Sequence, residues 1–251
     1  MARHKAIGRQ APSDGAEAPS APSRNTLLAS LPGDELSSVL ERCRETSFNL
    51  RQELFNEGDK IELGWFPLTG MGSLVTVLKD GTTLEALNVG REGFVGMELV
   101  NAVYTHQIKG ICQIAGYFLE IRAPDFLELL KTLPHFQIMM RRYSQFAHEV
   151  VKQSAACNSI HLLEQRCARW LLMTSDAVGR PSFSLTQEFL SQMLAVRRAG
   201  VTVAVGALER KGLIEHHYGE VAIKDMKGLR ETACECYSTI REKADLLLGD
   251  K

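Results

Sequence analysis

The hydrophobic pattern of this chain changes period twice. Apolar residues fall at helical spacing over about 26–43, then in short runs between glycine turns over 46–122, then again at helical spacing from 124 onwards. Short runs between frequent turns predict strands, and seven of them favour a small antiparallel barrel or jelly roll. The expected strands span 46–50, 53–55, 65–68, 72–78, 83–89, 108–114 and 117–121.

A long helix is predicted to begin at Pro134. Its apolar residues follow a 4-3-4 spacing, which is typical of the seam of a two-stranded coiled coil. We therefore predict a dimer helix, with an ordinary amphipathic helix as the alternative because four positions do not separate the two. The seam residues are Met139, Tyr143, Phe146 and Val150.

Residues 185–223 predict two helices joined by a turn and followed by a hairpin, which is a winged helix–turn–helix. Thr186 can cap the first helix, and Gly212 can end the second in a left-handed conformation. The expected elements are helices over 187–194 and 198–211 and strands over 213–217 and 220–223.

The second helix of this module has an exposed, positively charged start. Its buried stripe leaves polar and small residues at the N-terminus, where the helix dipole attracts phosphates. An arginine there can bind guanine with two hydrogen bonds, worth about 1–3 kcal/mol of discrimination. Adjacent arginines alone are ordinary surface residues, so it is the surrounding motif that favours DNA contact. The residues concerned are Arg197, Arg198, Gly200 and Thr202.

Charge is distributed unevenly along a chain whose formal net charge is −1. Residues 24–130 carry nine Lys/Arg and fifteen Asp/Glu, whereas residues 131–224 carry twelve and seven. The second half is therefore expected to meet an anion. Residues 181–224 carry only five Lys/Arg against four Asp/Glu. DNA binding by this segment therefore needs specifically positioned contacts, two copies of the chain, or additional contacts from Arg166 and Arg169.

The remaining composition points to a cytoplasmic protein with reduced thiols. No apolar run approaches a membrane span, and the Ala/Pro/Ser-rich start lacks the apolar stretch of an export signal. The same segment, residues 1–25, is expected to be a disordered arm.

The six cysteines do not suggest a metal site. Cys234 and Cys236 are close, but two thiolates do not complete a zinc or iron–sulfur site within one chain. We expect no metal, no cofactor and inert thiols, with a redox switch at 234/236 as a minor alternative. The other four cysteines, Cys43, Cys112, Cys157 and Cys167, are scattered along the sequence.

Three stretches resemble the CRP–FNR family of bacterial transcription regulators: LEQRCARWLLM at 163–173, the 185–214 run LTQEFLSQMLAVRRAGVTVAVGALERKGLI, and VGREGFVGMELV at 89–100. The resemblance covers about 26–237 and implies an α+β fold. After the arm, it implies a cyclic-nucleotide-binding-like antiparallel β-barrel sensor at 26–132, a dimerisation helix at 133–157, a winged helix–turn–helix DNA-binding domain at 158–237 and a C-terminal tail at 238–251.

The resemblance also implies roles for individual residues. Arg198 is similar to the family arginine that reads a guanine, and Thr186 resembles the residue that touches the DNA backbone. Ala199 stands where the cyclic-AMP-responsive branch carries an acidic residue, so the operator read is expected to differ. The remaining expected DNA contacts are Gln187, Arg197, Gly200, Thr202 and Val203, with wing contacts to phosphate from His216 and His217.

The sensor half departs from the family pattern. Cyclic-nucleotide cassettes resemble Phe-Gly-Glu with an Arg about ten residues on, whereas here Gly96 precedes Met97 and the arginine region reads Tyr-Thr-His-Gln at 104–107. Glu98 is one place late, which on a strand would be the opposite face. We expect no tight cyclic AMP binding, and these residues do not identify an effector. The possible effector pocket is Gly90, Gly93, Gly96, Glu98 and His106, although a lone histidine is more often a surface residue and the glycines more often barrel corners.

We therefore expect a homodimeric, sequence-specific transcription regulator that reads a palindromic site in double-stranded DNA. The family implies RNA polymerase as a further partner. The alternative is a cyclic-nucleotide-domain-like protein that acts only through protein–protein contacts. A barrel enzyme is disfavoured, because His106 is the only histidine between 46 and 122 and no nucleophile–base set is apparent.

Overall fold

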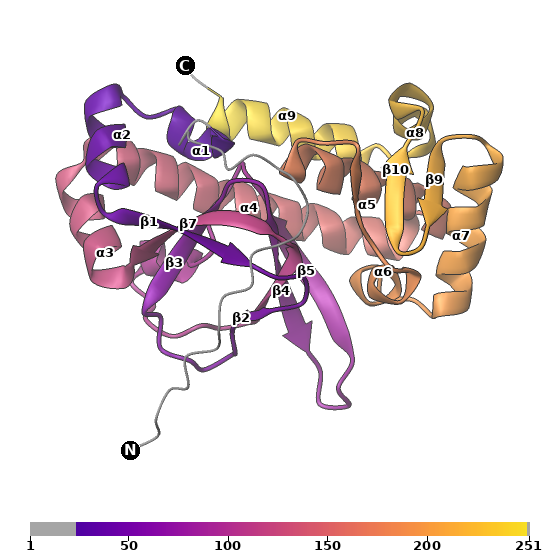
Figure 1. Ribbon diagram of the computed structural model, residues 1–251, viewed down its shortest axis with the longest axis horizontal. Helices are drawn as coiled ribbons and strands as arrows, with labels where there is room; N and C mark the ends of the chain where they lie inside the picture. The colour runs from indigo at the N-terminus through magenta and orange to yellow at the C-terminus, as the bar shows by residue number, and fades with distance from the viewer. Residues whose placement is uncertain (1–23, 250–251) are drawn as a thin grey trace.

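The computed structural model describes residues 24–249 and has the expected α+β architecture. Figure 1 shows a β-barrel beside a long helix, α4 (Pro134–Ile160), with a smaller helical module at the far end of that helix. None of the helices in the described range combines the length and apolarity needed to cross a membrane.

The barrel consists of two antiparallel sheets, ordered β1-β7-β3 and β2-β6-β4-β5. The seven strands expected between 46 and 122 are all present, with ends shifted by a few residues. Lys79-Asp80-Gly81 forms the predicted hairpin turn, and Gly81 takes a φ of +84° that favours glycine. The strands are β1 (Cys43–Phe48), β2 (Glu53–Phe55), β3 (Leu63–Pro67), β4 (Met71–Val77), β5 (Thr83–Val89), β6 (Lys109–Ile114) and β7 (Gly116–Arg122).

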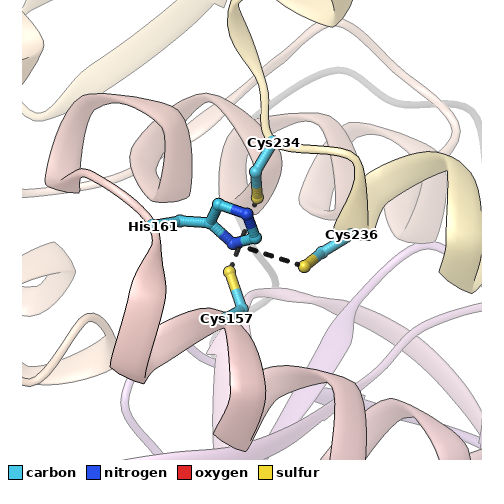
Figure 2. Close-up of side chains that lie close together, drawn as sticks. All are labelled: Cys157, His161, Cys234 and Cys236. Atoms are coloured by element: carbon cyan, nitrogen blue, oxygen red, sulfur yellow. Dashed lines mark hydrogen bonds between the residues drawn. The ribbon is translucent and has the colours of Figure 1, made fainter.

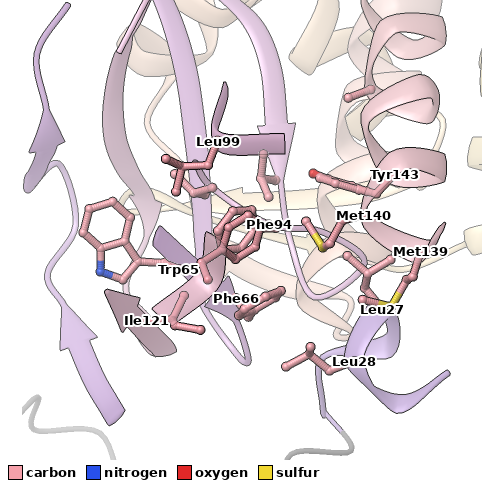
Figure 3. Close-up of a cluster of buried hydrophobic side chains, with 14 of the residues drawn as sticks. Leu27, Leu28, Trp65, Phe66, Phe94, Leu99, Ile121, Met139, Met140 and Tyr143 are labelled. Atoms are coloured by element: carbon pink, nitrogen blue, oxygen red, sulfur yellow. The ribbon is translucent and has the colours of Figure 1, made fainter. Parts of the chain in front are cut away.

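Aromatic side chains join the barrel to the helices beside it. The Phe94 ring stacks on Phe126 of α3 (Ala123–Thr132) at 4.6 Å between centroids, and Phe126 meets Phe136 of α4 edge-on. Figure 3 shows Met139, Met140 and Tyr143 of α4 turned toward the same core. The barrel and α4 therefore share one hydrophobic core.

The four residues predicted to form a dimer seam do not face a second chain here, because they are buried within their own chain. Met139, Tyr143, Phe146 and Val150 are between 2% and 8% exposed. Tyr143 packs so closely on Gly93 that a Cβ there would lie 2.2 Å from its hydroxyl. An apolar 4-3-4 stripe records only that a helix face is buried, not what covers it.

Part of the cover is α9 (Cys236–Leu248), which runs beside α4 in Figure 1. Ile240 belongs to the same buried cluster as the α4 stripe, and Lys243 donates to Glu149 at 2.6 Å. The segment 238–251 was expected as a tail, but as far as residue 249 it is this packed helix and its C-cap. The outward side of α4 is mixed: it carries Arg141, Gln145, His148 and Lys152, but also Ile138 and Val151, which are 49% and 41% exposed.

The N-terminal segment is ordered earlier than expected. Residues 1–23 of the expected arm lie outside the described residues, but Asn25 is fully buried. Its amide donates to the carbonyls of Pro67 and Gly93, each at 3.0 Å, and its side-chain oxygen caps α1 (Thr26–Ala29). Disorder is therefore the wrong prediction for Asn25, because three hydrogen bonds offset its ordering entropy.

Glu35 of α2 (Gly33–Leu40) caps the start of α4 from outside that helix. Its carboxylate accepts from the backbone N–H groups of His135 and Phe136 at 3.2 and 2.8 Å. Burial opposes ionisation, but these bonds and the His135 side chain lower the pKa of Glu35. A negative charge at a helix N-terminus is stabilising, so α2 fixes where α4 begins.

The helical module at the far end of α4 is a winged helix–turn–helix. Its three-stranded sheet, ordered β8-β10-β9, includes the short strand β8, which the sequence pattern did not predict. The elements are α5 (Leu163–Val178), β8 (Ser182–Ser184), α6 (Gln187–Met193), α7 (Arg198–Arg210), β9 (Ile214–His217), β10 (Glu220–Ile223) and α8 (Met226–Thr232).

A half-buried carboxylate links this module to the barrel. Glu85 of β5 accepts hydrogen bonds from Ser73 Oγ at 2.7 Å and from the indole N–H of Trp170 in α5 at 2.8 Å. Burial raises the pKa of Glu85, although both hydrogen bonds and the charge of Arg169 act in the opposite direction. The contact is therefore electrostatically costly when Glu85 is ionised.

We expect Glu85→Gln to flatten the pH dependence of stability. The folded state keeps the Glu85 proton at pH values where the unfolded chain has released it, so the free energy of unfolding falls as pH rises from the ordinary carboxyl range through the raised pKa. Urea unfolding across that range measures the slope. The exposed Glu57→Gln is the control and should keep the wild-type slope; equal slopes in Glu85→Gln and wild type would contradict the assignment.

Candidate nucleic-acid interface

The two helices of the helix–turn–helix begin where the sequence predicts. Thr186 caps α6 by accepting from the Phe189 N–H at 3.2 Å. The chain then turns at Ala195, whose φ of +55° is in the left-handed region, and α7 starts at Arg198 after Arg197 in the cap position. Gly212 ends α7 at φ +71°, as expected from its sequence position.

The start of α7 presents an open cationic face. Arg197, Arg198 and Thr202 are exposed, and Val203 is 70% exposed although it is apolar. Within residues 24–249 neither arginine has an ion-pair partner. Two unpaired guanidinium groups at a helix N-terminus form a surface suited to phosphates and base edges.

Two expected contact residues have a more structural place. A Cβ on Gly200 would lie 3.0 Å from the end of the Leu163 side chain, so the missing side chain leaves room for Leu163 of α5. Gln187 is half-buried and accepts a 2.8 Å hydrogen bond from the Thr202 hydroxyl, which ties α6 to α7. Gly200 is half-buried, so it is less exposed than the arginines beside it.

The wing separates its two histidines. His216 is half-buried, with Nε2 3.2 Å from the Leu185 carbonyl, whereas His217 is exposed. Neighbouring strand residues point to opposite faces, so only His217 is directed outward. Tyr218, which the sequence reasoning missed, is fully exposed at the turn, where it and Gly219 both have positive φ. An aromatic residue in a two-residue hairpin turn was the available signal.

The barrel contacts α6, the first helix of the helix–turn–helix. Arg51 donates to Thr186 Oγ1 at 3.1 Å, and its guanidinium lies 5.9 Å from the centre of the Phe189 ring. The hairpin between β4 and β5 lies beside the same helices, and Gly81 lines a groove with Arg197. The Thr186 hydroxyl is thus engaged within the chain, while most of the α7 start remains exposed.

Arg166 and Arg169 do not belong to this surface. They are 8% and 5% exposed, and one Arg166 N–H donates to the Leu194 carbonyl at 2.6 Å. Their suggested contribution to DNA binding is wrong, because both guanidinium groups lie inside the module.

The candidate effector residues of the barrel are largely engaged in contacts within the chain. His106 is only 2% exposed, stacks on Phe55 at 3.4 Å and lies 3.3 Å from Glu98 Oε1, so the surface placement expected for it is wrong. Burial raises the pKa of Glu98, but the hydrogen bond with His106 and backbone bonds lower it overall. Gly90 and Gly93 serve close packing, because a Cβ on either would clash with Ala177 or Tyr143. Gly96 takes a φ of +116°, which favours glycine.

The cysteines are less scattered than the sequence suggests. Cys157, at the end of α4, lies beside Cys234 and Cys236, and His161 completes a group whose ligand atoms are all within 4.8 Å of one another. Cys157 and His161 are one helical turn apart, a spacing that could have signalled paired ligands.

Residues 165–232 match the Crp-like helix-turn-helix domain family. This chain carries a Crp-like helix–turn–helix domain on a CRP/FNR-type fold. The match covers α5 through α8 and includes the cationic face, so the DNA-binding module is assigned independently of the barrel. The search of curated proteins found no match.

Solved structures resemble the chain well beyond the Crp-like domain. FixK2 from Bradyrhizobium japonicum is 14% identical, with a TM-score of 0.66 over 76% of this chain and 98% of its own. The c-di-GMP-responsive global regulator CLP of Xanthomonas campestris is 16% identical, with a TM-score of 0.62 over 76% and 99%. A CRP-family transcriptional regulator from Thermus thermophilus is 18% identical, with 0.62 over 75% and 96%. These likenesses establish the shared fold.

Proposed function

We propose that the chain is a transcription regulator that binds a palindromic DNA site as a homodimer, with Arg197 and Arg198 of α7 as the principal contacts. The exposed pair of guanidinium groups at the start of α7, without an ion-pair partner among residues 24–249, carries the proposal. Thr202, Val203 and His217 lie on exposed positions of the same module and supply further contacts. Recognition of double-stranded DNA by a helix in the major groove needs only such a short face.

Dimerisation is supported by charge rather than by the α4 stripe. The winged module has a nearly balanced charge, so a single copy neutralises few phosphates and two copies strengthen binding. Helix–turn–helix dimers place recognition helices about 34–36 Å apart on symmetric half-sites. Sedimentation of the chain with selected operator DNA should give two chains per duplex.

Arg198→Ala is expected to weaken binding to the selected site by about 1–3 kcal/mol, or about 5- to 150-fold, and to relax base preference at one position in each half-site. Selection from random DNA followed by fluorescence titration at fixed salt measures both effects. The matched control is Arg210→Ala, at the exposed end of the same helix. Equal losses in the two variants would indicate a nonspecific charge effect, and no loss in either would favour a protein that acts through protein contacts only.

Arg51→Met is expected to tighten DNA binding. The variant removes the 3.1 Å hydrogen bond to Thr186, so the first helix is released from the barrel at lower cost. One such bond is worth about 0.5–1.5 kcal/mol, which predicts up to about tenfold higher affinity. Arg44→Met removes the same charge from an exposed barrel strand and is the control. Weaker binding by Arg51→Met alone would mean that Arg51 itself contacts DNA.

We also propose that the barrel does not bind cyclic AMP tightly. The Glu98 carboxylate is engaged by His106, and 104–107 supplies no arginine for a cyclic phosphate. Calorimetry should show no binding at micromolar nucleotide, while DNA binding by the same sample confirms that it is folded. A micromolar or tighter dissociation constant would overturn this part of the proposal.

A further inference from the structure

Four side chains from distant parts of the sequence converge beside the link between α4 and α5. Cys157 lies in the last turn of α4, and His161 is the C-cap of that helix. Cys236 is the first residue of α9, and Cys234 lies two residues before it. The three cysteines are at most 4% exposed, and the His161 side chain is 15% exposed. Figure 2 shows the thiols and the imidazole turned toward one another.

The separations suit a single tetrahedral ion. Cys157 Sγ and Cys234 Sγ are 3.5 Å apart, and Cys236 Sγ is 3.6 Å from His161 Nδ1. Zinc bonded to sulfur at about 2.3 Å and to nitrogen at about 2.0 Å sets its ligands about 3.5–3.8 Å apart. The largest separation, 4.8 Å, needs a contraction of about 1 Å. An iron–sulfur cluster would hold its ligands further apart, because several atoms lie between them.

The neighbouring groups complete the surroundings expected of a metal site. Glu235 Oε2 lies 3.1 Å from His161 Nε2, so the imidazole can direct Nδ1 toward the sulfurs. Gln153 donates to Cys236 Sγ at 3.1 Å. Carboxylate–histidine pairs and hydrogen bonds to ligands commonly orient the ligands of a bound metal.

The charges around the four side chains also favour a metal site. Arg166 and Arg169 are buried close enough to interact electrostatically with Cys157 and Cys234. Among the described residues no carboxylate lies within ion-pair distance of either guanidinium, and the Nε of each lacks a hydrogen-bond partner. A divalent ion held by three thiolates and a neutral imidazole has one net negative charge, which would partly offset these two buried cations.

We propose that Cys157, His161, Cys234 and Cys236 bind one zinc ion, which fastens the start of α9 to the end of α4. Thiolates and imidazole in tetrahedral arrangement favour zinc over magnesium or calcium. The ion would also fix α9 over the α4 stripe at the point where the chain enters the winged module. The inference does not depend on DNA binding.

The first test is metal content and ligand identity. The full chain, purified under reducing conditions, should contain about one zinc per chain. After chelation it should take up Co²⁺ and develop the thiolate charge-transfer and tetrahedral bands of a Cys₃His site. Cys157→Ser should lose these bands, whereas Cys43→Ser, which alters a half-buried barrel cysteine, should keep them.

The second test uses an exposed residue, so that misfolding cannot explain the result. Glu235→Gln should lower Zn²⁺ affinity by about tenfold in a competition titration, because His161 loses its orienting carboxylate. Glu231→Gln, an equally exposed change on α8, should have no effect. Zinc should also raise the melting temperature and slow proteolysis of α9 in the wild type.

Three results would overturn the proposal. The first is reduced wild-type protein that binds neither Zn²⁺ nor Co²⁺. The second is iron with acid-labile sulfide in place of zinc. The third is a Cys157–Cys234 disulfide in oxidised protein whose reduced form takes up no metal. Wild-type protein that binds the metal but does not bind DNA would contradict only the proposed function.

Discussion

The apolar stripe of α4 organises the packing of the whole chain described here. A helix of 27 residues must bury that stripe, and here the barrel and α9 cover it together. Tyr143 meets the barrel backbone at Gly93, and Ile240 of α9 joins the same cluster. Both partners come from the same chain, so α4 connects the barrel, the C-terminal helix and the winged module.

The winged module follows α4 through α5 and also packs directly on the barrel. Met71, Val75 and Ile114 of the barrel belong to the same buried apolar cluster as the core of the module. Polar contacts add to this packing. Glu85 binds Trp170, and Arg51 binds Thr186. Hydrogen bonds of this kind contribute about 1 kcal/mol each, in addition to the apolar area buried between the barrel and the module. The Arg51 contact gives the barrel a physical route to influence α6 of the helix–turn–helix.

The thiol cluster lies where these parts meet. It contains residues from the end of α4, the link to α5 and the start of α9, so any ligand bound there acts on the position of all three. Its buried cationic neighbours, Arg166 and Arg169, lie on α5, the first helix of the winged module. The same two arginines are thus internal to the module rather than part of its DNA-facing surface.

The local elements could be predicted from the sequence: seven barrel strands, the long helix after Pro134, and the helix–turn–helix with its cap at Thr186 and stop at Gly212. Those signals are periodicity, capping and turn chemistry, which act over a few residues. Contacts between distant segments could not be predicted in this way: what covers the α4 stripe, the burial of His106 against Phe55, and the approach of Cys157 to Cys234. Each of these contacts depends on which distant segment packs nearby. The sequence pattern of an apolar face, or the presence of a cysteine, does not specify which segment that is.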